Sequence, residues 1–207
     1  MRVDDYKNAL AMAAKDLAGR NPAEVASMAG AVLDGTNLCL RFMNRDVMVS
    51  TASFKVAWAD QGPEEEFALT DAVMVLHYLQ EAKGLGPTGD FVAYRQIPGG
   101  EFYTAAFRKR AEQPLIGTFG HKPGLLSKAA PALGGRPSEG AGDEAAVFRV
   151  LPNMDVMAII HHGDDEFPPD GQVLFDKSVS LALNIEDIAW LGSALVYRLM
   201  SAARKVG

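Results

Sequence analysis

Two apolar, β-prone runs flank a short loop rich in ionisable side chains, and this pattern constrains the fold more than any other part of the chain. The first run is Val156–Ile160 and the second is Val173–Phe175. The chain between them carries two histidines, a glycine, three consecutive acids and a Phe-Pro-Pro sequence. Short apolar runs that end in glycine and proline are typical of buried strands. We therefore predict two strands joined by an exposed loop, a common place for binding sites.

Apolar spacing and capping residues predict the other elements. Apolar residues recur at three- and four-residue steps over 3–18, about 64–83 and the segment after Asn184. Asn21-Pro22 predicts the start of a short helix that ends at Gly30. The remaining predicted segments are hairpins at 37–43 with 46–50 and at 145–150 with 156–160, a strand over Phe91–Ile97, and helices over Glu101–Arg110 and residues 122–133.

These segments together predict an α+β fold. We expect an antiparallel or mixed sheet of two hairpins plus one strand, the Phe91 strand, packed with five or six helices. The chain has 207 residues, of which 48% are hydrophobic, so it can bury a core without disulfides. Residues 1–207 are expected to form a single domain.

Charge and cysteine content argue against several classes of protein. The formal net charge is -6 and the pI about 5.2, which gives no electrostatic support for binding nucleic acid or an anionic membrane. The single cysteine, Cys39, excludes an intrachain disulfide framework and an all-cysteine metal cluster. No apolar run approaches the length of a membrane span, and the N-terminal acids do not suit a signal peptide. We expect a cytoplasmic protein.

The loop after the first apolar run contains the strongest candidate site residues. His161, Asp164, Asp165 and Glu166 are candidate ligand-binding residues, together with Asp176 at the end of the second run. Because side chains alternate along a strand, we expect His161 to approach one of the acids while His162 points away. Imidazole and carboxylate groups suit a transition metal, so His161, Asp165 and Glu166 are also candidate metal ligands.

Two other interpretations of this loop remain open. A histidine beside a carboxylate can act as an acid–base pair. Alternatively, the loop is structural: Asp164 and Asp165 cap the turn, and Phe167 anchors the loop in the core.

A glycine pair between a predicted strand and a predicted helix forms a second candidate site. Gly99 and Gly100 allow a close approach of the backbone, and the N–H groups of such a turn can bind an anion. Tyr94, Arg95 and Tyr103 flank this turn and are further candidate ligand-binding residues. The segment lacks both the dinucleotide-binding glycine pattern and the phosphate-loop lysine, so a tight structural turn is the alternative.

Five short motifs in a fixed order carry a family resemblance. They are Leu76–Leu79, Tyr94–Tyr103, Gly163–Pro168, Leu174–Asp176 and Glu186–Asp187. In these motifs the chain resembles the domain of unknown function numbered 3786, over about residues 20–200. The family occurs mainly in anaerobic bacteria and methanogenic archaea. The resemblance therefore implies a role in anaerobic metabolism, in a one-carbon, corrinoid or metallocofactor context. Some members carry an iron–sulfur domain, for which this chain has no cysteine-rich segment.

The leading functional hypothesis is a cytoplasmic ligand- or cofactor-binding accessory protein of anaerobic metabolism. Its ligand would lie between Tyr94–Tyr103 and His161–Asp176, and the cofactor is unknown. One alternative is a metal-dependent enzyme that uses a His/carboxylate cluster at a strand end. Another is a structural or protein-interaction module, for instance a homodimer, without a small-molecule site.

Overall fold

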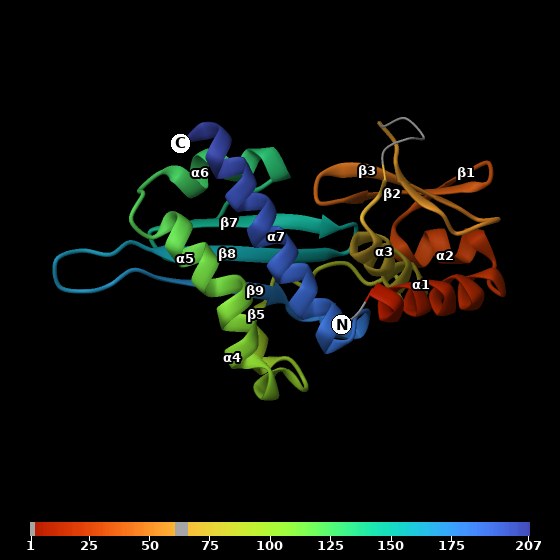
Figure 1. Ribbon diagram of the computed structural model, residues 1–207, viewed down its shortest axis with the longest axis horizontal. Helices are drawn as coiled ribbons and strands as arrows, with labels where there is room; N and C mark the ends of the chain where they lie inside the picture. Colours follow the sequence, from red (N-terminus) through yellow and green to blue (C-terminus); the bar gives the residue numbers. More distant parts are fainter. Residues whose placement is uncertain (1–2, 61–65) are drawn as a thin grey trace. The chain divides into compact units, whose positions relative to one another are not determined.

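The computed structural model describes residues 3–60 and 66–207, and these form two compact units (Figure 1). Unit 1 comprises the chain up to Gly86 together with residues 151–153 and 181–183. Unit 2 comprises residues 87–150, 154–180 and 184–207. Both contain helices and an antiparallel sheet, so the predicted α+β class is confirmed.

Unit 1 combines three helices with a four-stranded sheet. The helices are α1 (Val3–Ala18), α2 (Pro22–Ala29) and α3 (Leu69–Glu81). The strands are β1 (Val32–Asp34), β2 (Asn37–Phe42), β3 (Arg45–Ser50) and β4 (Val56–Trp58), in the order β1-β2-β3-β4.

Local sequence signals set several boundaries in unit 1. The Asn21 side chain accepts a hydrogen bond from the N–H of Ala23, and Gly30 ends α2 in the left-handed conformation, as predicted. The predicted β2–β3 hairpin is also confirmed. Its two-residue turn is Met43-Asn44, both at positive φ, which matches the twist of the strands.

Helix α3 is mostly buried, as its wide apolar surface predicts. Tyr78 is fully buried. Its hydroxyl donates to the carbonyl of Ala29 at 2.7 Å and accepts from the N–H of Asn153 at 3.2 Å. The helix begins at Leu69, later than expected, and the expected start at Glu64 lies outside the described residues.

Unit 2 is built on a five-stranded sheet in the order β5-β9-β8-β7-β6. The strands are β5 (Phe91–Ala93), β6 (Arg136–Pro137), β7 (Glu144–Leu151), β8 (Met154–His161) and β9 (Asp170–Asp176). Strands β8 and β9 contain the two apolar runs and pair antiparallel, with Val156 opposite Phe175 and His161 opposite Asp170. The two strands and their connecting loop are therefore as predicted.

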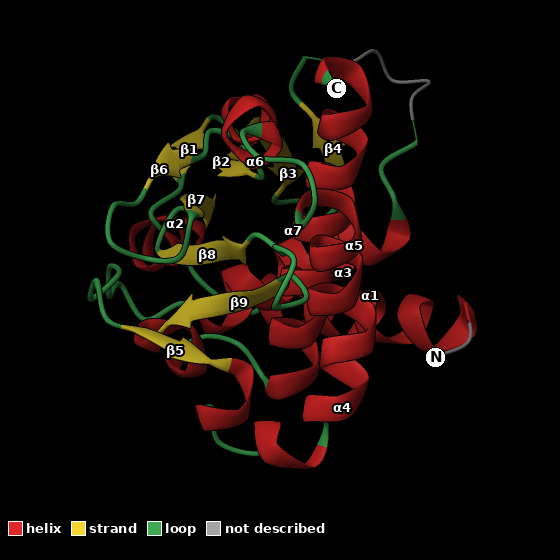
Figure 2. Ribbon diagram, turned by 90° about the vertical axis from the view of Figure 1, so that its left-hand side faces the viewer, coloured by secondary structure: helices red, strands yellow, loops and turns green. Residues whose placement is uncertain are grey.

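Helices cover one face of this sheet (Figure 2). A continuous helical segment comprises α4 (Thr104–Phe107), a π-helical turn (Arg108–Glu112) and α5 (Gln113–Phe119). The last helix, α7 (Ile185–Val206), begins at its predicted cap, Asn184, and buries Ile188, Leu191, Leu195 and Leu199. Shorter helical elements are η1 (Tyr94–Gln96), η2 (Gly100–Phe102), α6 (Leu125–Ala129), η4 (Ala130–Leu133) and η5 (Lys177–Leu181).

The structure corrects the finer predictions in three places. The two hairpins belong to different sheets, whereas one sheet was expected. The strand at Phe91 ends at Ala93 and turns into η1, because β9 pairs with only three of its residues. The helix expected to end at Arg110 continues to Phe119, and Phe102, near its expected start, is 81% exposed.

Among the described residues, no helix combines the length and the apolar character that a membrane crossing requires.

Candidate functional site

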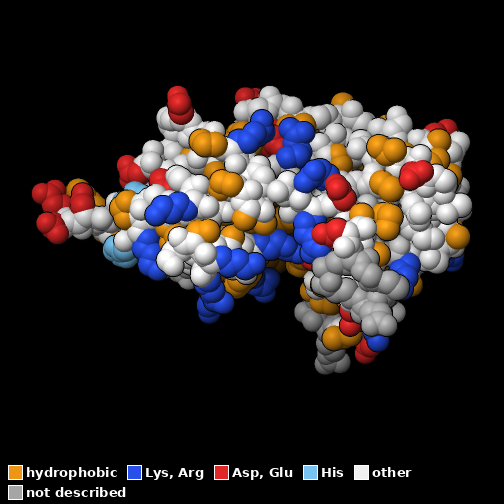
Figure 3. All heavy atoms as spheres, turned by 90° about the horizontal axis from the view of Figure 1, so that it is seen from above, with side chains coloured by type: hydrophobic (Ala, Val, Ile, Leu, Met, Phe, Trp, Pro, Cys, Tyr) orange, Lys and Arg blue, Asp and Glu red, His pale blue; other side chains and the backbone are white. Residues whose placement is uncertain are grey.

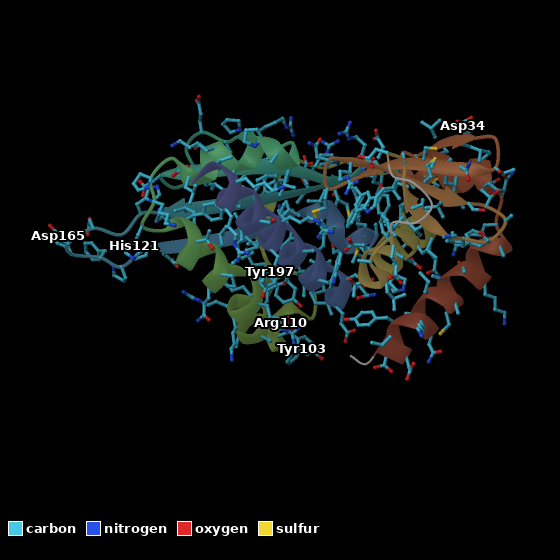
Figure 4. All side chains as sticks on the ribbon, turned by 45° about the horizontal axis from the view of Figure 1, so that its top comes forward. Asp34, Tyr103, Arg110, His121, Asp165 and Tyr197 are labelled. Carbon is cyan, nitrogen blue, oxygen red and sulfur yellow. The ribbon has the colours of Figure 1, made fainter. Side chains whose placement is uncertain are left out.

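The acidic loop between β8 and β9 holds its own conformation through Asp164. One carboxylate oxygen of Asp164 accepts hydrogen bonds from the N–H groups of Glu166 at 2.8 Å and Phe167 at 2.7 Å. These bonds lower the pKa of the exposed Asp164 carboxyl. Figure 4 shows Asp165 at the tip of the loop and His121 near its base. Phe167 is 67% exposed, so the expectation that it anchors the loop in the core is wrong.

The two histidines at the end of β8 differ in surroundings. The exposed His161 faces Asp170 across the strand pair. The half-buried His162 has its Nε2 atom 2.9 Å from a carboxylate oxygen of Glu144 and its Nδ1 atom 3.2 Å from the carbonyl of Gly120. The His162 ring therefore contacts an acid of β7, and neither of these two contacts involves the loop acids Asp164, Asp165 and Glu166.

Glu144, at the start of β7, is the centre of this hydrogen-bond network. Its carboxylate accepts from the N–H of Gly124, from the N–H and hydroxyl of Ser127, and contacts His162. Burial raises the pKa of Glu144, but the hydrogen bonds from Ser127, Gly124 and His162 lower it by more than burial raises it. The net shift of the Glu144 pKa is therefore downward. Both partners of the His162 ring are acceptors, so both contacts are hydrogen bonds only in the imidazolium form. The network thus fixes the base of the acidic loop.

The predicted metal ligands lie on one loop but do not form a preassembled set. Within residues 3–60 and 66–207, no group of three or more histidine, cysteine or acidic residues is arranged to hold a metal ion. Figure 3 shows acidic side chains gathered at one end of the molecule, with histidines beside them. Metal binding by His161, Asp165 and Glu166 stays a prediction.

Asp176 has a buried carboxylate that the chain's own donors surround. It accepts hydrogen bonds from the N–H and hydroxyl of Thr88, from the N–H of Gly89, and from the N–H and hydroxyl of Ser178. Burial raises the pKa of Asp176, but these bonds outweigh burial and lower it overall. The residue joins the end of β9 to the segment before β5, which is a structural role.

The glycine turn is also tightly packed. A Cβ atom on Gly100 would lie 2.0 Å from the carbonyl oxygen of Tyr94, so only glycine fits there. Gly99 has a φ of 83°. The ring of Tyr94 is buried and stacks on Phe107, with centroids 4.4 Å apart, while its hydroxyl donates to the carbonyl of Ile185 at 3.2 Å. These contacts account for Tyr94, Gly99 and Gly100 as parts of the fold, and leave Arg95 and Tyr103 exposed.

A cluster of charged residues surrounds the π-helical turn next to β9. Arg108 lies 3.5 Å from the carboxylate of Asp170. Glu112, one turn further, is half-buried and accepts a hydrogen bond from the backbone N–H of Val173. Arg95 lies near enough to lower the pKa of Glu112. We call Arg95, Arg108, Glu112 and Asp170 the π-turn cluster.

Glu112 is the member of this cluster whose pKa is shifted from its ordinary value. Burial raises the pKa of its carboxyl, and the nearby Asp170 raises it further. The hydrogen bond from Val173 and the charges of Arg108 and Arg95 oppose this shift without cancelling it. π-helical turns and displaced pKa values both occur frequently at functional sites.

Tyr103 and Arg110 lie near each other at α4 (Figure 4), and the charges of both act on the Tyr94 phenol. Burial is the main effect that raises the pKa of Tyr94, and the charges of Glu186 and Tyr103 raise it further. The charge of Arg110 opposes this shift by lowering the pKa. Arg108 and Arg110 lie on one helical segment; the charge of Arg95 acts on Glu112 of that segment, and Tyr103 and Arg110 both act on Tyr94. The loop residues His161 and Asp164–Glu166 contribute no side chain to the π-turn cluster.

Sequence reasoning missed Glu112, Arg108 and Glu144. The run Arg108-Lys109-Arg110 is visible as a basic cluster, but nothing in it predicts a π-helical turn. Glu144 precedes a β-prone run and looks like an ordinary strand-edge acid. Only the tertiary fold places it against His162.

These elements define an α+β protein with a pre-ordered acidic loop and a charged π-helical turn. The chain belongs to the family described as Domain of unknown function (DUF3786), whose model matches residues 21–198. No curated protein and no solved structure matches the chain.

Proposed function

We propose that this chain is a cytoplasmic ligand-binding accessory protein whose ligand is an anionic cofactor or metabolite held at the π-turn cluster. The observation that carries this proposal is the position of Arg108 and Glu112 on a π-helical turn beside β9, with the charge of Arg95, from η1, acting on Glu112. The family resemblance supports a place in anaerobic metabolism.

The arginines favour a ligand with carboxylate or phosphate groups. A guanidinium has five N–H donors in a planar fork that matches these anions. The Arg108–Asp170 pair, at 3.5 Å, leaves 57% of the Arg108 side chain and 54% of the Asp170 side chain exposed. Exposed pairs of this kind contribute only about 0–1 kcal/mol, so an anionic ligand can displace Asp170 at little cost.

Glu112 favours a ligand that accepts a hydrogen bond. Because its pKa is raised, its carboxyl binds a proton more readily than an exposed glutamate does. A protonated carboxyl donates one hydrogen bond, which a phosphate or carboxylate oxygen accepts. Tyr103, which is 54% exposed and directly precedes α4, offers an aromatic surface for the body of a larger ligand.

Calorimetric titration with citrate and pyrophosphate, as carboxylate and phosphate probes, tests the proposal. We expect binding by the unmodified chain and a loss of affinity of about tenfold or more in Arg108→Ala and Arg95→Ala. Arg204→Ala, an exposed position on α7, is the matched control and should bind normally. Equal affinities in Arg108→Ala and Arg204→Ala, or no binding of either probe, would contradict an anion site here.

A further inference from the structure

We propose that unit 1 contains a second binding site, a small pocket for a carboxylic acid with a compact apolar body. The pocket has a volume of about 180 Å³ and lies among α1, α2 and the sheet β1–β4. Its apolar lining includes Leu17, Val25 and Leu38, and its other walls include Ala18, Arg20 and Phe54. All of these residues belong to unit 1, so the pocket is separate from the π-turn cluster.

Burial separates the floor of the pocket from its mouth. Leu17, Val25 and Leu38 are at most 7% exposed and form an apolar floor. Ala18 and Arg20 are exposed, so they form the mouth. Apolar cavities of roughly 150 Å³ accept a benzene ring, so the volume here suits one ring or a short branched chain.

Arg20 gives the mouth its preference for an acid. The guanidinium donates to the carbonyl of Gln80 and pairs with Asp16, which fixes its position. These contacts engage two of its five N–H groups and leave others to bind a carboxylate. The side chains of Arg20 and Asp16 are 40% and 42% exposed, so their ion pair is weak and a ligand carboxylate can compete with it.

The backbone conformation of Phe54 is the second observation in favour of a ligand. It lies in the turn between β3 and β4 with a φ of 54°, a conformation that a bulky residue adopts only at a cost. The turn is held by hydrogen bonds from the N–H of Phe54 to the carbonyl of Ser50 and from the Thr51 hydroxyl to the carbonyl of Thr36. The strained backbone keeps the Phe54 ring in the pocket wall, and strain of this kind clusters at ligand clamps.

The test is an NMR titration of the methyl-labelled full chain with benzoate, benzyl alcohol and acetate. We expect benzoate to shift the methyl resonances of Leu17, Val25 and Leu38, with an affinity in about the millimolar range or better. Benzyl alcohol, which keeps the ring but lacks the charge, should bind more weakly. Acetate, which lacks the ring, should bind weakest. No shift of these three methyl groups with benzoate would overturn the proposal.

Two variants and a matched control locate the ligand. Ala18→Leu fills the mouth and should weaken benzoate binding about tenfold, whereas Ala11→Leu, exposed on the same helix and outside the pocket, should leave it unchanged. Arg20→Gln should bring benzoate down to the affinity of benzyl alcohol. Unchanged benzoate binding in Ala18→Leu would overturn the site. Citrate and pyrophosphate binding at the π-turn cluster should be the same in all three variants.

Discussion

At the scale of single residues, the carboxylates of this protein fall into two groups. Asp176 and Glu144 are buried or half-buried acceptors that the chain's own donors satisfy, and the pKa of each is lowered. Glu112 is half-buried with few such donors, and its pKa is raised. A saturated carboxylate holds the fold together, whereas one left with a raised pKa is available for chemistry.

Replacing Asp176 with asparagine should destabilise the chain by about 2 kcal/mol or more, because the amide group presents donors to a cluster of donors. The pKa of Asp176 is below its ordinary value of 3.8, so the stabilising charge is fully present above that pH. It is lost as the pH falls through the lower, folded-state value. The stability gap between the two proteins should therefore close in acid.

Urea unfolding at neutral and acidic pH measures this gap. Asp165→Asn, at the exposed loop tip, is the matched control and should unfold like the unmodified chain. If Asp176→Asn and Asp165→Asn were equally stable at neutral pH, the hydrogen-bonded carboxylate would not be a structural clamp.

At the scale of elements, the continuous helical segment from α4 to α5 is the feature that connects structure with proposed function. Its π-helical turn sets Arg108 and Glu112 beside β9, and its N-terminal end follows the turn that contains Gly100. Gly100, before this segment, and Gly117, within it, differ in the space that is available for a side chain. A Cβ atom at Gly100 would meet the carbonyl of Tyr94, whereas one at Gly117, in α5, would meet nothing within 4 Å.

Gly100→Ala should therefore lower the free energy of unfolding by about 1–3 kcal/mol, because the backbone must shift to admit the methyl group. Gly117→Ala should raise it by up to about 1 kcal/mol, since alanine is the better helix former. Thermal unfolding of both variants by circular dichroism measures the difference. A stable Gly100→Ala variant that fails to bind citrate or pyrophosphate would instead assign the glycine turn to the ligand site.

At the scale of the whole molecule, the chain passes between the two units several times. Residues 151–153, in the turn between β7 and β8, belong to unit 1, and the N–H of Asn153 donates to Tyr78 there. Unfolding of unit 1 would release the turn of a hairpin whose strands lie in unit 2. The expectation of a single domain, which stays a prediction, therefore implies one cooperative transition.

The two tryptophans allow the cooperativity of unfolding to be measured. Trp58 lies in unit 1 and Trp190 in unit 2, so Trp190→Phe reports on the first unit and Trp58→Phe on the second. We expect the fluorescence change in urea to coincide with the loss of circular dichroism within each single-tryptophan variant. Fluorescence and circular dichroism midpoints that separate within either variant would show that the units unfold independently.

The sequence by itself determined the class of fold, most helix and strand positions, and the caps at Asn21, Gly30 and Asn184. These features depend on apolar spacing and on backbone groups within a few residues, which local sequence encodes. Tertiary structure alone decided that the hairpins lie in separate sheets, that the helix continues past Arg110 through a π-turn, and that His162 meets Glu144. These outcomes depend on which distant groups share a limited buried volume, and spacing along the chain does not specify that choice.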